Sequence, residues 1–131
     1  NLASRLEGAN KFYDTLILLG PRTYELAAKD IEAREVDRLR VKGKQEPVVV
    51  FELLARKGGL PAERCRVIEL YREGLEAYRR RDFKTAAAQC AAALALDPMD
   101  GPSRVYLERA KEYLLAPPPT DWDGVYELKS K

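Results

Sequence analysis

Two small groups of polar residues have types and spacing that could act on a phosphate-bearing substrate. Asn1 and Arg5 are four residues apart in a segment with helical periodicity, so they would share one helix face. Lys42 opens a Lys-Gly-Lys sequence that reads as the tip of a β-hairpin. The arginine guanidinium is planar, charged and rich in N–H donors, which suits phosphate oxygens. Taken singly, an Asn/Arg helix face and a lysine-rich turn are also ordinary surface features, so these residues alone leave both interpretations open.

The composition excludes several other chemistries. The chain has no histidine, which removes histidine-based triads, the usual zinc clusters and the commonest general base. Lys and Arg number 23 and Asp and Glu 21, so the net charge is only +2 and gives no reason to expect nucleic-acid binding. The longest basic run, 79–81, is predicted to be a solvated turn. Hydrophobic residues at 46% and charged residues at 34% are typical of a soluble globular protein.

The expected location is the cytoplasm. No stretch approaches the ~20 apolar residues that a membrane span requires, and nothing resembles a signal peptide. Cys65 and Cys90 fall inside predicted helices, where we expect both to be small buried hydrophobic residues in a reducing compartment. The chain opens Asn-Leu-Ala-Ser-Arg without Met, which predicts that it belongs to a longer protein.

The first part of the chain mixes helix and strand patterns. Apolar residues recur at helical spacing, then form a short buried run, then alternate on two β-prone stretches around a polar turn. A Gly-Pro pair closes the buried run, and its proline can open a second helix. The predicted elements are a helix over 1–12, a strand over 15–19, a helix over 21–29, and two hairpin strands between Ile31 and Leu54. The first of these includes Val36, Leu39 and Val41, and the second covers 48–54.

Gly and Pro residues then mark a linker, beyond which the pattern is wholly helical. Helices are predicted over 62–80, 82–96 and 103–115, the last two with Asp82 and Ser103 as N-caps. The predicted organisation is a first domain over 1–56, a linker over 57–61, a helical module over 62–116 and a proline-rich tail over 117–131.

The tail contains Trp122, which is the only tryptophan. Three prolines over 117–119 should keep the chain extended, and residues 121–128 suit a short strand or a docking peptide. Because an exposed indole forgoes a large apolar burial, we expect Trp122 to dock in a groove while Asp121 and Asp123 stay solvated. A disordered terminus is the alternative.

The first 54 residues resemble the end of a class III adenylate or guanylate cyclase catalytic domain. The resemblance rests on Asn-Leu-Ala-Ser-Arg-Leu-Glu at 1–7, on the buried run near 16–19, and on Val-Lys-Gly-Lys at 41–44 followed by Pro47 and a strand. It implies an α+β fold, in which a partial, ferredoxin-like cyclase lobe with a β-hairpin precedes an all-α, tetratricopeptide-like helical hairpin and a capping helix.

The same resemblance implies roles for three residues. Asn1 would orient the ribose 3′-oxygen, Arg5 would brace the α-phosphate in the transition state, and Lys42 would contact the β- and γ-phosphates. The family also binds two Mg²⁺ or Mn²⁺ ions through upstream aspartates that this chain lacks. Asp14, Asp30 and Asp37 do not match those positions and are expected to face solvent.

The substrate that the resemblance implies is ATP or GTP, and the base-reading residues that would separate adenine from guanine also lie upstream. The family's active site forms between two catalytic domains, so the intact parent is expected to be a homodimer. An upstream sensory and membrane region is common in bacterial cyclases with such tails, which makes a membrane anchor outside this chain an expectation too.

The helical module resembles one tetratricopeptide repeat. Matching positions are Leu70, Gly74, Phe83, Ala86, Ala93 and Pro98, and departures are Glu73, Ala77, Arg81 and Cys90, where the family more often has Leu, an aromatic residue, Gly and another aromatic residue. One repeat cannot bury its own faces. We therefore expect a structural appendage that packs on a neighbouring surface, with a peptide-binding groove as the alternative.

Together these patterns predict part of a nucleotide cyclase, an enzyme that makes a cyclic mononucleotide and pyrophosphate for intracellular signalling. This chain by itself should be inactive because it lacks the metal carboxylates. The alternative, from a different functional class, is a non-catalytic interaction module built on a cyclase remnant and one helical repeat.

Overall fold

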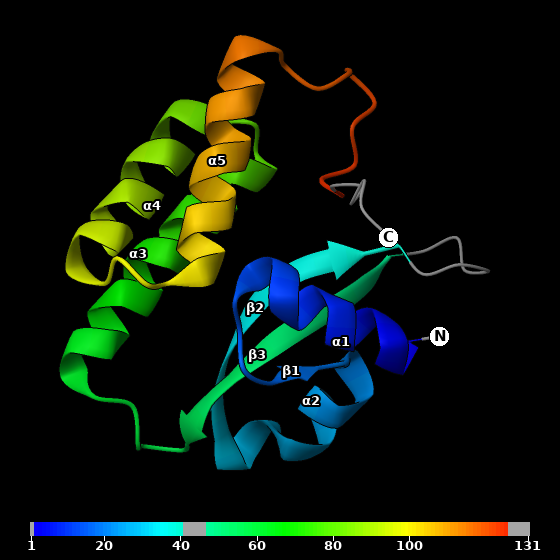
Figure 1. Ribbon diagram of the computed structural model, residues 1–131, viewed down its shortest axis with the longest axis vertical. Helices are drawn as coiled ribbons and strands as arrows, with labels where there is room; N and C mark the ends of the chain where they lie inside the picture. The colour runs from blue at the N-terminus through cyan, green and yellow to red at the C-terminus, as the bar shows by residue number, and fades with distance from the viewer. Residues whose placement is uncertain (1, 41–46, 126–131) are drawn as a thin grey trace. The chain divides into compact units, whose positions relative to one another are not determined.

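A computed structural model describes the backbone of residues 2–40 and 47–125, and side chains from Leu6 onward within those ranges. The chain divides into two compact units (Figure 1). The first, the sheet unit, holds residues up to Leu60 together with the segment from Asp123, and the second, the helical unit, is Pro61–Trp122. The sheet unit combines helices with an antiparallel sheet and the helical unit is all α, so the predicted α+β class is confirmed.

The sheet of the first unit has the order β1-β3-β2 with antiparallel neighbours. The strands are β1 (Leu18–Leu19), β2 (Ile31–Leu39) and β3 (Val48–Arg56). The two antiparallel strands of the predicted hairpin are therefore confirmed, and β2 begins at Ile31, where the strand pattern was predicted to begin. The strand predicted over 15–19 is shorter, because Thr15 donates both its backbone N–H and its hydroxyl to Asn10 at the end of the preceding helix.

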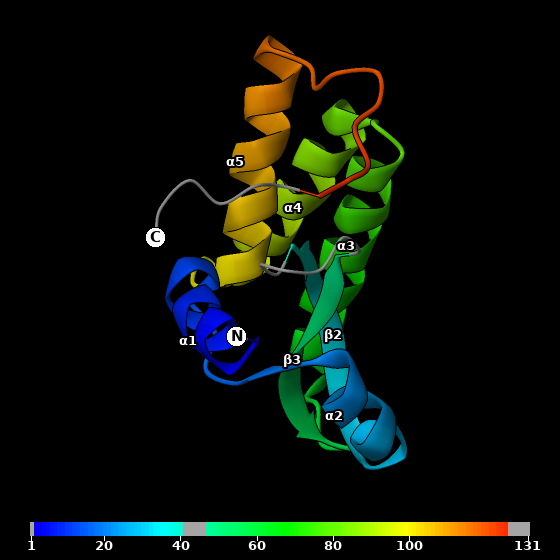
Figure 2. The same cartoon turned by 90° about the vertical axis from the view of Figure 1, so that its right-hand side faces the viewer.

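Two α-helices and a short 3-10 helix pack on this sheet. They are α1 (Leu2–Tyr13), α2 (Pro21–Ala27, with proline in its first turn) and η1 (Ala28–Asp30). Tyr24 of α2 stacks on Phe51 of β3, with ring centroids 3.9 Å apart. Tyr13 of α1 bonds to Asp37, which pairs with the next β3 residue, Val50. Successive strand residues point to opposite faces, so α2 and α1 contact opposite faces of the sheet (Figure 2).

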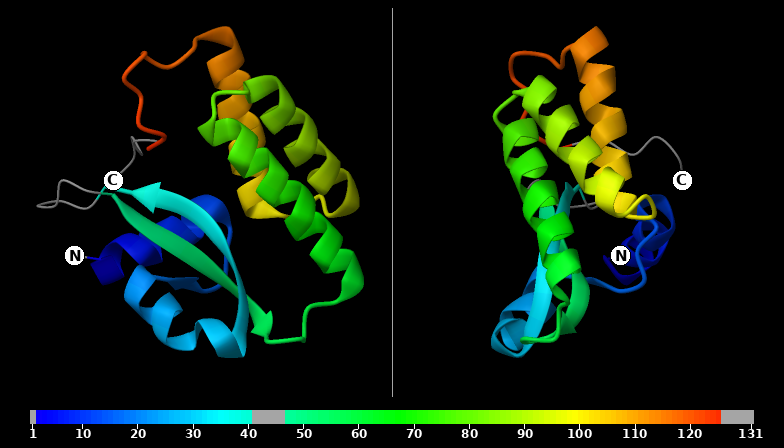
Figure 3. Two further views of the ribbon diagram at one scale, coloured as in Figure 1. Left: turned by 180° about the vertical axis from the view of Figure 1, so that it is seen from behind. Right: turned by 90° about the vertical axis from the view of Figure 1, so that its left-hand side faces the viewer.

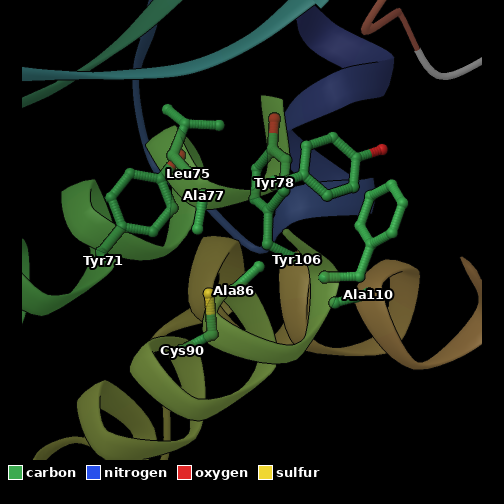
Figure 4. Packing of buried hydrophobic residues seen from close by; sticks show 9 residues of the cluster. Tyr71, Leu75, Ala77, Tyr78, Ala86, Cys90, Tyr106 and Ala110 are labelled. Carbon is green, nitrogen blue, oxygen red and sulfur yellow. The ribbon is translucent and has the colours of Figure 1, made fainter. Parts of the chain in front are cut away.

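The helical unit consists of α3 (Ala62–Arg79), α4 (Phe83–Leu96) and α5 (Gly101–Leu115). The three helices pack against one another (Figure 3). At the α3–α4 crossing, a Cβ on Gly74 would lie 2.6 Å from Cys90 Sγ, so only glycine allows this approach. The adjoining core is rich in tyrosine: Tyr71, Tyr78 and Tyr106 are almost completely buried (Figure 4).

The structure corrects two predictions, one about a helix N-cap and one about a cysteine. Asp82 caps α4 as predicted, since its carboxylate accepts a hydrogen bond from the Thr85 N–H. Ser103 does not cap α5: the helix begins at Gly101, and the buried Ser103 hydroxyl donates to Asp100 at 2.6 Å. Cys90 is buried as expected, and burial raises the pKa of its thiol to about 12. Cys65 is exposed, so its prediction was wrong: it lies on the outer face of the first turn of α3.

The tail leaves α5 without forming a strand between Pro117 and Val125. Trp122 packs against the core of the helical unit, which confirms the docking prediction. Asp121 and Asp123 are exposed, also as predicted. Among the described residues, none of the helices has the length and apolar character to cross a membrane.

Candidate functional site

The three predicted site residues fall at the edges of what the structure describes. Asn1 and Lys42 lie outside the described residues. Arg5 lies on the first half of α1, and its side chain is outside the described part. The structure therefore describes the helix that carries Arg5 and the two strands that lead to and from Lys42, and the site is built from these supports.

The helix that carries Arg5 is fixed at its other end by a buried hydrogen bond. Tyr13 is the last residue of α1, and its hydroxyl donates to the carboxylate of Asp37 on β2. Tyr13 is fully buried and Asp37 is 1% exposed. The second Asp37 oxygen accepts the Arg38 N–H at 2.8 Å. The prediction that Asp37 faces solvent was wrong, because this aspartate orients α1 on the sheet.

The hairpin that carries Lys42 is held by a buried ion pair between its strands. Arg34 on β2 stands directly opposite Glu52 on β3. Its Nε and NH2 atoms both lie 2.7 Å from Glu52 Oε1, and the two side chains are only 2% and 11% exposed. A charged pair with this burial fixes register, because a shift of one residue would leave two unpaired charges in the interior.

The sequence pattern did not reveal this pair, although it contained one signal. Glu52 interrupts the apolar run over 48–54, and a carboxylate within a buried strand requires a cationic partner. Arg34 lies one residue further from the turn than Glu52 does, because β2 has one extra residue at the irregularity between Glu35 and Asp37. Counting outward from the turn would have placed the two side by side had this irregularity been known.

A second arginine of β2 is bound to the tail segment of the same unit. Arg40 follows the last residue of the strand, and its NH2 lies 2.7 Å from Asp123 Oδ2 in an exposed pair. The Val125 N–H bonds the other Asp123 oxygen at 3.0 Å. The hydrogen bond from the Val125 N–H is the main cause that lowers the pKa of Asp123 below its usual value, and the bond from Arg40 lowers this pKa further. The guanidinium of Arg40 is therefore paired with a carboxylate of the same chain, Asp123.

The acidic residues of the described part do not form a metal site. Within residues 6–40 and 47–125, no three acidic, histidine or cysteine side chains are placed to hold an ion. Asp14 and Asp30 are exposed, as predicted, and the Asp37 carboxylate is occupied by Tyr13 and Arg38. The residues that the structure describes thus do not fit the two ions that the cyclase resemblance implies.

Comparison with known proteins supports the cyclase relationship. The chain is 29% identical over 113 residues to a protein described as adenylate cyclase, terminal-differentiation specific, from Dictyostelium discoideum. The match covers 83% of this chain, which is more than either structural unit holds, so it includes parts of both units. The chain spans only about 5% of the relative's length. No protein-family profile and no solved structure matches the chain.

Proposed function

We propose that this chain is the C-terminal part of a nucleotide cyclase catalytic domain followed by a helical module of tetratricopeptide type. The intact parent would convert ATP or GTP to a cyclic mononucleotide and pyrophosphate in intracellular signalling, as a homodimer. The observation that carries the proposal is the similarity to an adenylate cyclase across both units. The sequence pattern at 1–7 and 41–47 agrees with it.

The chemistry of cyclisation explains the role proposed for each of the three residues. The ribose 3′-oxygen attacks the α-phosphorus while pyrophosphate leaves, and negative charge grows on the leaving group. Arg5 would stabilise the α-phosphate in the transition state, Asn1 would orient the attacking oxygen, and Lys42 would bind the β- and γ-phosphates. Such groups accelerate a reaction only when they are held in place before it starts.

The buried contacts of the sheet unit would supply this rigidity. The Tyr13–Asp37 hydrogen bond fixes the direction in which α1 leaves the sheet, and hence where Arg5 stands. The Arg34–Glu52 pair fixes the register of the two strands that precede and follow Lys42 in the sequence. We assign all four of these residues positioning roles, because each acts through an element that carries a proposed site residue.

No group of ligands for the two Mg²⁺ or Mn²⁺ ions expected of the family is found among residues 6–40 and 47–125. We assign those ligands to a part of the parent outside this chain and derive no step through the ions. What the described residues of this chain would contribute is the scaffold of the phosphate-binding half of the site.

The helical unit supports the tetratricopeptide part of the proposal in its packing. Gly74 lies where α3 and α4 cross, close to Cys90 and the Ala86 carbonyl. Phe83 and Ala93 are buried on α4, and Pro98 follows its end. These are the roles that small, aromatic and helix-ending residues would have in a single repeat, and α5 would be the capping helix.

A product assay on two proteins tests the proposed function. The 131-residue chain should give no cyclic nucleotide from ATP or GTP with Mn²⁺, because it lacks metal carboxylates. The full-length parent should convert one of the two nucleotides under the same conditions. Circular dichroism of the short chain is the control that it is folded. Turnover by the short chain, or its absence from a folded, dimeric parent, would contradict the assignment and favour the non-catalytic interaction module.

A further inference from the structure

The helical unit contains an aromatic cage that the cyclase chemistry does not use. One ring from each helix surrounds Trp122: Tyr78 of α3, Phe83 of α4 and Tyr113 of α5. Their centroids lie 5.3, 5.8 and 5.5 Å from that of the indole, the range in which tilted aromatic pairs attract. Burial is the main cause that raises the pKa of Tyr113, which is half-buried in this cluster.

Arg81 closes the cage from the connection between α3 and α4. Its NH1 donates to the Pro119 carbonyl and its NH2 to the Pro118 carbonyl, each at 2.9 Å. Its guanidinium carbon lies 5.7 Å from the centre of the Trp122 ring, within cation–π distance. One side chain thus binds both the backbone and the side chain of the same short segment.

The backbone of Arg81 supports a binding role. Its φ is +68°, in the left-handed region, where a non-glycine residue costs roughly 1 kcal/mol or more. Glycine would adopt the same connection without that cost. An arginine at this position therefore destabilises the connection between α3 and α4 relative to glycine. Its contacts with the tail give a functional reason for an arginine here.

We propose that Tyr78, Arg81, Phe83 and Tyr113, here called the Trp122 cage, form a peptide-binding site for a segment in which two prolines lead into a turn that ends at a tryptophan. In this chain the Trp122 N–H donates to the Pro119 carbonyl at 3.0 Å. The tail of this chain is its resident ligand. Consecutive prolines restrict the backbone of the part before the turn in advance, so that part loses little entropy on binding. Aromatic grooves that bind proline-rich segments depend on the same small loss of conformational entropy. The proposal does not depend on the cyclase assignment.

Covalent attachment decides how the site behaves in the intact chain. A segment joined by a short linker competes at an effective concentration in the millimolar range. The tail should therefore exclude a free peptide of the same type until its own contacts are weakened. The Trp122 cage should therefore remain able to bind a peptide when the tail no longer occupies it. Removing the Trp122 side chain should make the cage available to a free peptide.

The test uses the full chain with Trp122→Ala and a fluorescein-labelled peptide of residues 116–124. Fluorescence anisotropy should show saturable binding to this variant, and at least about tenfold weaker apparent binding to the wild-type chain, where the tail competes. Since Trp122 is the only tryptophan, the indole of an unlabelled peptide can be followed against the variant, and its emission should shift to the blue.

Arg81→Gly in the Trp122→Ala background separates binding from folding. It should weaken peptide binding about tenfold while the melting temperature stays the same or rises, because the strained backbone is relieved. Arg72→Ala, which removes an exposed arginine of α3, is the matched control and should leave binding unchanged. Absence of saturable binding, or undiminished binding after Arg81→Gly, would overturn the proposal.

If Trp122→Ala does not fold, the single variant Arg81→Gly gives the answer by itself. Its Trp122 emission should move to the red and become more open to iodide quenching than that of the wild type. Unchanged emission and quenching would contradict a cage closed by Arg81.

Discussion

In the proposed parent cyclase, Arg5→Ala should lower turnover by about 10²–10³-fold, on the order of 3–4 kcal/mol, with little change in nucleotide affinity. The reason is that the guanidinium would meet charge that develops on the α-phosphate only as the 3′-oxygen attacks. Alanine keeps the helix, since Arg5 lies in the first half of α1 and alanine is a good helix former. Product formation at saturating ATP or GTP gives the turnover number directly.

Two further variants make this result specific. Lys42→Ala should act mainly on apparent affinity, because contacts to the β- and γ-phosphates already exist in the bound ground state. Arg22→Ala removes an exposed arginine from α2 and should leave both parameters unchanged. Turnover of the Arg5→Ala enzyme within about twofold of the wild type would exclude a catalytic role for Arg5.

The largest effect on stability is expected for Arg34→Met in this chain. The substitution leaves the Glu52 carboxylate buried without its partner, and breaking a buried pair in this way typically costs about 3–5 kcal/mol. Replacing both residues, as Arg34→Met with Glu52→Leu, removes both charges and should restore most of the loss. Urea unfolding followed by circular dichroism gives the free energies of all three variants.

The matched control is Arg38→Met on the same strand. Arg38 is 40% exposed and lies 3.9 Å from Glu35, so its loss should change the free energy of unfolding by less than about 0.5 kcal/mol. The interpretation fails if Arg34→Met is as mild as this control. It also fails if the double variant is no more stable than the Arg34→Met variant.

The elements of the fold were largely predictable because they rest on local patterns. The polar sequence between two β-prone runs specified the hairpin, and apolar spacing specified α3 to α5. Asp82 was recognisable as a cap because it directly precedes an alanine-rich helix. Ser103 was misassigned because Gly101 and Pro102 had been placed outside α5, whereas proline is well tolerated in a first turn.

The supports of the site were not predictable, because they join residues distant in sequence. The bond between Tyr13 and Asp37 depends on where α1 packs on the sheet, and no local pattern fixes that. Arg34 and Glu52 meet beyond an irregularity between Glu35 and Asp37, which shifts the register by one residue, and no local sequence pattern reveals that shift. Asn1, Arg5 and Lys42 were identified through resemblance, since their residue types are ordinary on any surface.

The central claim is that this chain supplies the phosphate-binding half of a site shared between two protomers. Co-expression of two inactive parent variants tests it most directly: one carries Arg5→Ala, and the other lacks the metal-binding aspartates expected outside this chain. In a two-fold dimer with random pairing, half of the dimers are mixed and each has one intact site, so about a quarter of wild-type product formation should return. Mixed dimers that assemble and yet form no cyclic nucleotide would contradict the claim.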